Sequence, residues 1–313
     1  MTNRGKDAEA GSSRQPYHIP VLLNEAVDAL QIKPDGIYVD CTYGGGGHSA
    51  EILKRLGAHG RLLVFDQDPD ARANLPVDPR IEFIPHNFRH LKRFLKLHQA
   101  EKVDGVLADL GVSSHQFDEA SRGFSTRYDG PLDMRMDPAG PVTAASILRD
   151  YSWEALQQIF SAYGEITNAR SLAIHLTEYR KHQPLQTIGQ LKAGLQGFIK
   201  GNPHKYLAQL FQALRIEVNQ EITALKELLE QLPDVLKPGG IAAIISFHSL
   251  EDRLVKQFFR DDQQETKPIN PYSREERLKP FSLVNRKPIQ PGEKEILQNP
   301  RSRSARLRVA LKT

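Results

Sequence analysis

Three apolar runs of this sequence end in an acidic residue, and a glycine cluster follows the first of them. Asp40 closes the run that begins at Ile37, and Gly44–Gly47 come next, before a helical pattern. Glycine lets the backbone turn sharply and approach a ligand, and the N-terminus of the following helix offers free N–H groups. A strand–glycine–helix unit of this kind predicts a nucleotide site at the carboxyl end of a sheet.

The residues around the glycines indicate which ligand the turn binds. The dinucleotide fingerprint requires a third glycine where Ser49 stands, and the Gly-Lys-Ser/Thr of a phosphate-binding Walker loop is absent. Asp40, directly before the turn, favours a ligand with a cationic group over a pyrophosphate. S-adenosylmethionine carries both an ammonium and a sulfonium group, so we expect it to be the cofactor.

Two further residues are candidates for contacts with the adenosine. Asp66 ends the second apolar run, 19 residues after Gly47, where an acid can accept both ribose hydroxyls. Phe88 follows the third predicted strand and either flanks the adenine or belongs to the core. Asp68 is expected only to cap a short helix, with Pro69 at its first position.

Asp109 ends the fourth predicted strand, beside the expected centre of the site. A carboxylate there can accept a hydrogen bond from an amine and orient its lone pair, or it can bind the cofactor. Methyl transfer from a sulfonium is an in-line displacement in which positioning and desolvation supply most of the catalysis. We therefore predict Asp109 as the catalytic residue, with no metal.

A polar segment, Ser246–Arg253, follows the fifth predicted strand. His248 and Ser249 are candidates for contact with the acceptor. Ser249 with Asp252 three residues later also resembles a capping box, and this pattern favours a helix cap for Ser249.

The elements that must position these residues alternate between strands and helices. Strands are predicted at 37–41, 61–65, 81–84, 103–110, 241–245 and 305–311, and such alternation is typical of a mostly parallel sheet with both faces covered. The alternation stops at His115, and helical patterns follow, with Leu207–Leu232 expected to return to the sheet as one helix. We predict a disordered tail at 1–16, a main domain at 17–114 and 207–313, and a mainly helical insertion at 115–206.

Composition narrows the class of protein further. The 313 residues include one cysteine, Cys41, so no intrachain disulfide can form, which fits a reducing cytoplasm. No apolar run reaches the roughly 18 residues that a membrane helix needs. The formal net charge is +4, but Lys267–Thr313 carries twelve lysines and arginines against four glutamates. This segment indicates a polyanionic partner or a solvated tail.

The motifs together resemble the bacterial small-subunit ribosomal RNA (cytosine-N4)-methyltransferase family, from His18 to Arg308. The most specific segments are Asp40–His48, Asp109–Ser114, Arg122–Ser125, Asp129–Asp137 and Ser246–Arg253. The resemblance implies an α/β, class I methyltransferase (Rossmann-like) fold with an inserted helical domain for substrate recognition. It also implies a cytoplasmic enzyme that uses S-adenosylmethionine to methylate the N4 amine of a cytosine in the decoding site of 16S ribosomal RNA, within a small-subunit particle. No protein partner is implied.

By the same resemblance the cofactor-binding residues are Gly46, Gly47, His48, Asp66, Phe88, Asp109 and Gln116. His115 departs from the proline of many relatives and is expected to alter the stiffness of the loop before Gln116. No aromatic residue follows Asp109 to stack on the base. Our hypothesis is that Phe124 or Tyr128 supplies that stack.

Two other functions share parts of this pattern. A nicotinamide-dependent dehydrogenase would share the glycine turn and the ribose acid, but the missing third glycine and Asp40 argue against it. A non-catalytic RNA-binding assembly factor would share the basic C-terminal segment. The acids at the strand ends argue against a pure binding module.

Overall fold

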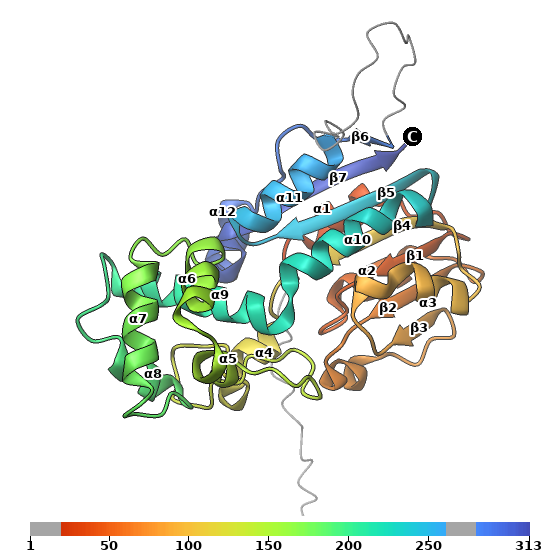
Figure 1. Ribbon diagram of the computed structural model, residues 1–313. Helices are drawn as coiled ribbons and strands as arrows, with labels where there is room; N and C mark the ends of the chain where they lie inside the picture. The colour runs from red at the N-terminus through yellow and green to blue at the C-terminus, as the bar shows by residue number, and fades with distance from the viewer. Residues whose placement is uncertain (1–19, 261–279) are drawn as a thin grey trace, which may run out of the picture.

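The computed structural model describes residues 20–260 and 280–313, and a seven-stranded sheet lies at its centre (Figure 1). The strands are β1 (Ile37–Asp40), β2 (Arg61–Phe65), β3 (Ile81–Ile84), β4 (Val103–Asp109), β5 (Leu236–Ser246), β6 (Phe281–Leu283) and β7 (Arg306–Lys312). Their order is β3-β2-β1-β4-β5-β7-β6, and the first five are parallel. β7 runs antiparallel to both neighbours, as its arrow in Figure 1 shows. The predicted mostly parallel sheet is confirmed, whereas the short β6 was not predicted.

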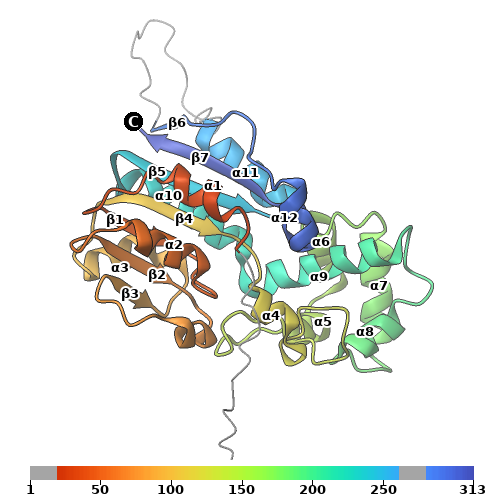
Figure 2. The same cartoon turned by 180° about the vertical axis from the view of Figure 1, so that it is seen from behind.

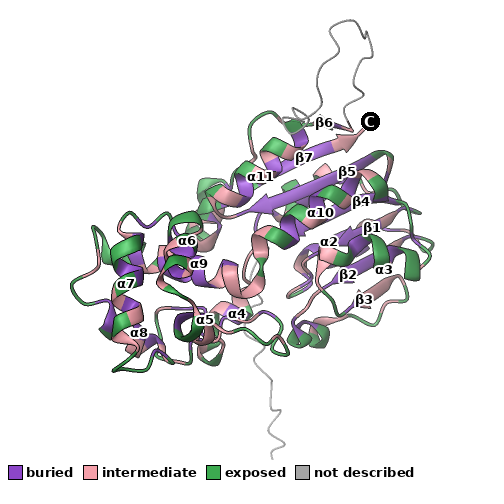
Figure 3. Cartoon of the chain, in the orientation of Figure 1, coloured by how far each residue is buried: buried purple, intermediate pink, exposed green. Residues whose placement is uncertain are grey.

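The sheet is buried on both faces because successive residues of each strand point to opposite sides. Val39 joins the core beneath α3 (Leu91–Leu97), α10 (Glu221–Val235) and α11 (Ser249–Arg260). Tyr38 joins the core beneath α1 (Leu23–Ala29) and α2 (Gly47–Arg55). Figures 1 and 2 show these two helical layers from opposite sides, and in Figure 3 the strands between them are mostly coloured as buried.

A group of helices beside the sheet forms a second core, and we refer to residues 114–219 as the helical lobe. It contains α4 (Ser114–Asp118), η3 (Ala120–Arg122), α5 (Ala144–Asp150), α6 (Trp153–Ala162), α7 (Ala169–Tyr179), α8 (Ile188–Gly194) and α9 (Pro203–Asn219). Its buried residues extend from Phe124 to Leu214. Between residues 115 and 206 the only β pairing is an isolated bridge of Pro131 with Thr187. The helical character predicted for this stretch matches these elements.

The prediction of one helix over Leu207–Leu232 is wrong. The helix is interrupted at Gln220. The φ of this residue is 50°, a left-handed conformation that interrupts helical hydrogen bonding. α9 packs in the core of the helical lobe through Leu210 and Leu214, whereas α10 packs on the sheet. This packing favours Gln220 as the boundary between the two parts, in place of the predicted residue 207.

β5 starts five residues before the predicted Ile241 and contains a turn in its first half. Pairing with β4 passes from Leu236 to Ile241 while β4 advances only from Val103 to Gly105. The residues between Leu236 and Ile241 therefore leave the ladder, with Gly239 at a φ of 78°.

In Figure 1 the arrowhead of β5 points toward the helical lobe. Because β1, β2 and β4 are parallel to β5, the residues that follow all four strands meet at this one edge of the sheet. None of the helices in the described ranges is long and apolar enough to cross a membrane.

Candidate active site

The turn after β1 adopts a conformation that requires glycine. Gly44 and Gly46 have φ values of 49° and 75°, in the left-handed region. A Cβ on Gly46 would lie 2.6 Å from the Tyr43 hydroxyl oxygen, and a Cβ on Gly47 would lie 2.1 Å from Cγ of Pro20. α2 begins at Gly47, so the turn presents the free N–H groups of a nine-residue helix.

Asp40 is buried and holds this turn in place. One carboxylate oxygen accepts the Thr42 backbone N–H at 3.0 Å, and the other accepts the Ser49 hydroxyl at 2.7 Å. Ser49 therefore replaces the third glycine of the dinucleotide fingerprint with a contact to the acid. Both Asp40 oxygens already accept a hydrogen bond. Asp40 therefore acts on a ligand through its negative charge and not as a free hydrogen-bond acceptor.

Asp66 follows β2 and reaches back to the glycine turn. Its Oδ2 accepts the Gly44 N–H at 2.7 Å, and its Oδ1 accepts the Asp68 N–H at 2.8 Å. Burial raises the pKa of Asp66 to about 6 against the lowering effect of these two hydrogen bonds, and the charges of Asp68 and Asp40 add to the rise. Asp66 therefore lies beside the glycine turn with a pKa close to neutral pH.

Asp109 ends β4 with one carboxylate oxygen that lacks a partner. Its backbone N–H donates to the Thr42 hydroxyl at 2.7 Å, whereas its Oδ1 is buried and has no hydrogen-bond partner among the described residues. Burial raises the pKa of Asp109 well above its usual range, and the nearby carboxylates of Asp40 and Glu251 raise it further. Since an unpaired buried acceptor is costly, this oxygen fits a polar or cationic ligand.

His48 lies opposite Asp109 and is buried. Its Nε2 is 3.0 Å from the Val21 carbonyl oxygen, which can only accept, so we assign the ring proton to Nε2. Its Nδ1 is 3.9 Å from Oδ2 of Asp109. Burial lowers the pKa of His48, so the ring is neutral and lines the site between the glycine turn and β4.

Gln116 is buried, and its contacts run to Asp68. Its Nε2 donates to Oδ2 of Asp68 at 2.7 Å, and its Oε1 accepts the Ser113 N–H at 3.1 Å as part of a capping box on α4. Asp68 does cap η1 (Pro69–Asn74), as predicted, by accepting the Asp70 N–H. The sequence did not indicate that the same carboxylate also binds Gln116 and Arg122.

Phe88 opens the short helix η2 (Phe88–His90) after β3 and is partly buried against the core of the sheet. The side chain of the preceding residue, Asn87, donates to Gln67 Oε1 at 3.0 Å. This hydrogen bond joins the loops after β3 and β2, so Phe88 follows a segment fixed next to the loop of Asp66.

The segment after β5 differs from the prediction at its helix cap. Ser249 is the first residue of α11, and its hydroxyl donates to Glu165 at 3.3 Å. His248 takes the capping position, since its backbone oxygen accepts the Asp252 N–H and its Nδ1 accepts the Glu251 N–H at 3.4 Å. Asp252 instead binds Arg308 and Arg306 on β7.

Three side chains near this cap bring possible metal ligands together. Atoms of Glu221, His248 and Glu251 lie within 4.8 Å of one another. However, both Glu221 oxygens bind the guanidinium of Arg215, at 2.8 and 2.9 Å. Nδ1 of His248 accepts the Glu251 N–H, so this nitrogen is also occupied. These contacts describe an ion-pair cluster and supply no open set of metal ligands.

The two aromatic candidates for base stacking differ in accessibility. Phe124 is 5% exposed and packs in the core of the helical lobe, so in this conformation it cannot stack on a base. Tyr128 is 48% exposed. The hypothesis therefore survives for Tyr128 alone.

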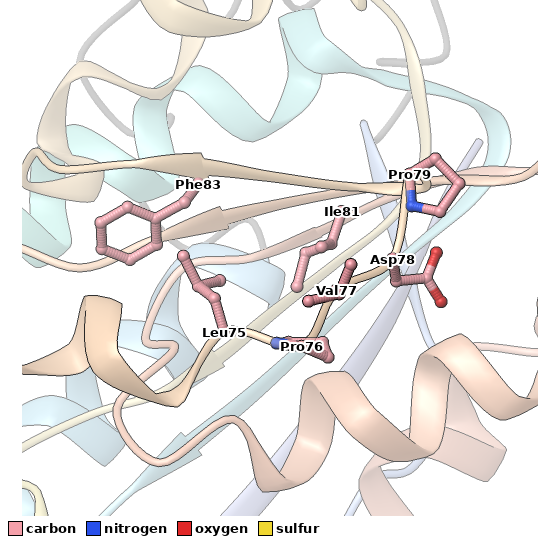
Figure 4. A pocket seen from close by; sticks show the side chains of 7 residues that line it. All are labelled: Leu75, Pro76, Val77, Asp78, Pro79, Ile81 and Phe83. Atoms are coloured by element: carbon pink, nitrogen blue, oxygen red, sulfur yellow. The ribbon is translucent and has the colours of Figure 1, made fainter.

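An apolar pocket of about 440 Å³ lies elsewhere, at the β3 edge of the sheet (Figure 4). It is lined by Leu75, Pro76, Val77, Asp78, Pro79, Ile81 and Phe83. It contains none of the predicted site residues, so we do not associate it with the site.

The strand order, the glycine turn and the acids at the ends of β1, β2 and β4 define a class I methyltransferase that uses S-adenosylmethionine. Residues 15–313 match the sequence profile of the MraW methylase family. The chain therefore belongs to the MraW methylase family.

Relatives of known name agree with this assignment. The protein named "Ribosomal RNA small subunit methyltransferase H" from Bacteroides fragilis is 52% identical over 297 residues, which span 95% of this chain and 97% of the relative. Its counterpart of the same name from Christiangramia forsetii is 53% identical, over 95% of this chain and 98% of the relative. Nothing in these matches supports the dehydrogenase or assembly-factor alternatives.

Among solved structures, a putative rRNA-methylase from Clostridium thermocellum covers 95% of this chain and 100% of its own. It shares 15% identity with a TM-score of 0.43. A likeness at this level carries no functional information.

Proposed function

We propose that this protein transfers a methyl group from S-adenosylmethionine to the exocyclic N4 amine of a cytosine in the decoding site of 16S ribosomal RNA. The observation that carries the proposal is the buried Oδ1 of Asp109 beside the glycine turn, which has no hydrogen-bond partner in the part of the chain that the structure describes. Two relatives that are 52% and 53% identical carry a name that describes methylation of small-subunit ribosomal RNA.

The residues at this edge of the sheet fit the cofactor. Gly46 and Gly47 let the turn pack closely against Tyr43 and Pro20 at the start of α2, and the surrounding acids favour a cation. We assign the ribose hydroxyls to Asp66 and the flanks of the cofactor to Phe88 and Asp109. Gln116 completes the set through Asp68, which it binds in this structure.

When bound, S-adenosylmethionine supplies a methyl group on a sulfonium sulfur, which an amine can accept in an in-line displacement. We assign contact with the acceptor amine to Asp109. Its Oδ1 accepts a hydrogen bond from the N4 amine and so orients the lone pair of that nitrogen. Because its pKa is raised well above the usual range, Asp109 is also a better proton acceptor than an ordinary carboxylate. Nδ1 of His48 lies 3.9 Å from Oδ2 of this carboxylate, and the Asp109 backbone N–H donates to the Thr42 hydroxyl.

We assign recognition of the RNA to the helical lobe and the basic C-terminal residues. Several cations of the lobe are exposed, namely Arg127, Arg170, Lys200 and Lys205. Exposed cations contact phosphates without reading sequence, so they position the RNA while the site selects the base. We expect the substrate to be a small-subunit particle in the cytoplasm.

A methyl-transfer assay with nucleoside mapping tests this function. Small-subunit particles from cells that lack the enzyme are incubated with the protein and isotope-labelled S-adenosylmethionine, and their nucleosides are separated by mass spectrometry. The proposal predicts labelled N4-methylcytidine at one position of the RNA. Label on another base, or on protein only, would overturn it. Titration with adenosylhomocysteine and with NAD separates it from the dehydrogenase alternative.

A further inference from the structure

One arginine connects the helical lobe to the loop that contains Asp66, the residue that we assign to the cofactor ribose. Arg122 ends η3 in the lobe, and its side chain is 13% exposed. One terminal nitrogen lies 2.8 Å from Oδ2 of Asp68, and the other donates to Asp70 at 3.4 Å. Arg122 therefore binds two carboxylates that follow β2, that of Asp68 in the loop and that of Asp70 in η1, which also lies 3.2 Å from Nε2 of His115.

The same guanidinium is fixed on its other side by the backbone of the lobe. The nitrogen that faces Asp68 also donates to the carbonyl oxygens of Arg135 and Met136, at 3.0 and 3.1 Å. The loop around Met136 is in turn attached to the end of α9, since the Asn219 side chain accepts the Met136 N–H and donates to the Met134 carbonyl, both at 2.7 Å. Asn219 directly precedes Gln220, where the helix is interrupted between α9 and α10.

Asp68 links Arg122 to Asp66, the residue that we assign to the cofactor ribose. Its backbone N–H donates to Oδ1 of Asp66 at 2.8 Å, and its carboxylate is 6% exposed. Removing one partner of a buried ion pair leaves an uncompensated charge, so Asp68 cannot keep this position at low cost without Arg122. The Asp68 carboxylate would then keep the neutral donors Gln116 Nε2 and the Asp70 N–H, and its charge would repel that of Asp66.

We propose that Arg122 is a positioning residue that couples cofactor binding to the placement of the helical lobe, through Asp68 and Asp66. The proposal rests on the proposed contact of Asp66 with the cofactor ribose. When the ribose fixes Asp66, Asp68 is fixed as well, and Arg122 holds the Met134–Met136 loop and α9 against it. Because coupling between two sites is reciprocal, placement of the lobe by RNA raises cofactor affinity to the same extent.

Two variants and a control separate this coupling from an ordinary stabilising ion pair. Arg122→Gln removes the charge and the guanidinium group. Arg122→Lys keeps the charge but can contact either Asp68 or the backbone carbonyls of the lobe, and not both. Arg149→Gln is the control, since Arg149 is exposed and pairs with its neighbour Asp150. Thermal unfolding of each variant establishes that it is folded.

The first readout is the affinity for adenosylhomocysteine, measured by calorimetry. We expect Arg122→Gln to weaken binding about tenfold, which is within the range typical of coupling between two sites, with Arg122→Lys intermediate and Arg149→Gln unchanged. The second is hydrogen exchange with saturating adenosylhomocysteine. In the wild type, protection extends from the loop of Asp66 to the Met134–Met136 loop. In Arg122→Gln, it stops at the loop of Asp66.

The outcomes distinguish this inference from the proposed function. If the wild type binds no adenosylhomocysteine, the proposed function fails and this inference fails with it. If the wild type binds and Arg122→Gln binds equally well, or protects the lobe equally at saturation, the inference alone is overturned. Should Arg122→Gln not fold, Asp68→Asn is measured in both readouts with the same expected results, and wild-type behaviour of that variant overturns the inference.

Discussion

His48 and Asp109 face each other across the carboxyl ends of β1 and β4, with 3.9 Å between Nδ1 and Oδ2. The histidine is fixed by the Val21 carbonyl and the aspartate by the Thr42 hydroxyl. The other oxygen of Asp109 remains unpartnered among the described residues. With the ring proton on Nε2, Nδ1 of His48 and the buried Oδ1 of Asp109 are both acceptors beside the glycine turn.

Asp109→Asn is expected to lower kcat by about 100-fold or more, since an amide cannot accept the proton of the amine. The substitution keeps the size of the side chain, so folding should be preserved. Steady-state methylation of small-subunit particles measures the effect. Asp234→Asn, an exposed residue paired with Lys92, is the control. Full activity of Asp109→Asn with unchanged cofactor affinity would show that the assigned role is wrong.

Cofactor affinity should depend on pH through Asp66, whose pKa is about 6. Ribose hydroxyls donate to the ionised carboxylate, so binding favours the deprotonated form. Affinity for adenosylhomocysteine is therefore full above about pH 7 and falls as pH drops through 6, by up to about tenfold per pH unit. The groups that face Asp66 are the carboxylates of Asp40 and Asp68 and the N–H groups of Gly44 and Asp68. Calorimetry between pH 5 and 8 measures this, and a flat profile would contradict the assignment.

Gly47→Ala should destabilise the fold by about 1–3 kcal/mol, because the new Cβ would lie 2.1 Å from the Pro20 ring. The same collision displaces the start of α2, so cofactor affinity should fall too. Denaturant unfolding gives the stability change. Gly292→Ala is the matched control, since its Cβ would meet nothing within 4 Å and its φ is −73°. Equal stability of the two variants would mean that Pro20 does not constrain the turn.

Glu295 on α12 (Glu293–Gln298) is expected to stabilise the segment that covers the glycine turn. Its Oε1 accepts the Leu22 N–H at 2.8 Å, and Leu22 is a buried residue with a φ of 52°. Glu295→Ala leaves this N–H unpaired and should cost about 1–3 kcal/mol of stability, whereas Glu295→Gln keeps an acceptor and should cost less. Denaturant unfolding compares the two. An equal loss in both variants would indicate that the charge of Glu295 matters more than its hydrogen bond.

The acids at the strand ends were predictable because their positions follow from local pattern. Asp40, Asp66 and Asp109 each close an apolar run, and parallel strands bring their carboxyl ends to one edge of the sheet. The capping of η1 by Asp68 was predicted for a similar reason, since a cap depends on residues within one turn.

The contacts that were missed join residues far apart in the chain. Arg122 binds Asp68 across 54 positions, and Glu295 binds Leu22 across 273. No local periodicity encodes such pairs. The break at Gln220 was missed because a non-glycine residue in the left-handed region gives no signal in sequence. Phe124 was misplaced because its motif-rich neighbourhood suggested exposure, whereas it packs in the helical lobe.

The most direct test of the site is a crystal structure of the protein with adenosylhomocysteine. We predict the ligand on the turn of Gly46 and Gly47, its ribose hydroxyls on Asp66, and its sulfur side toward Asp109. A ligand bound elsewhere, with the carboxylates of Asp66 and Asp109 turned away from it, would contradict the account.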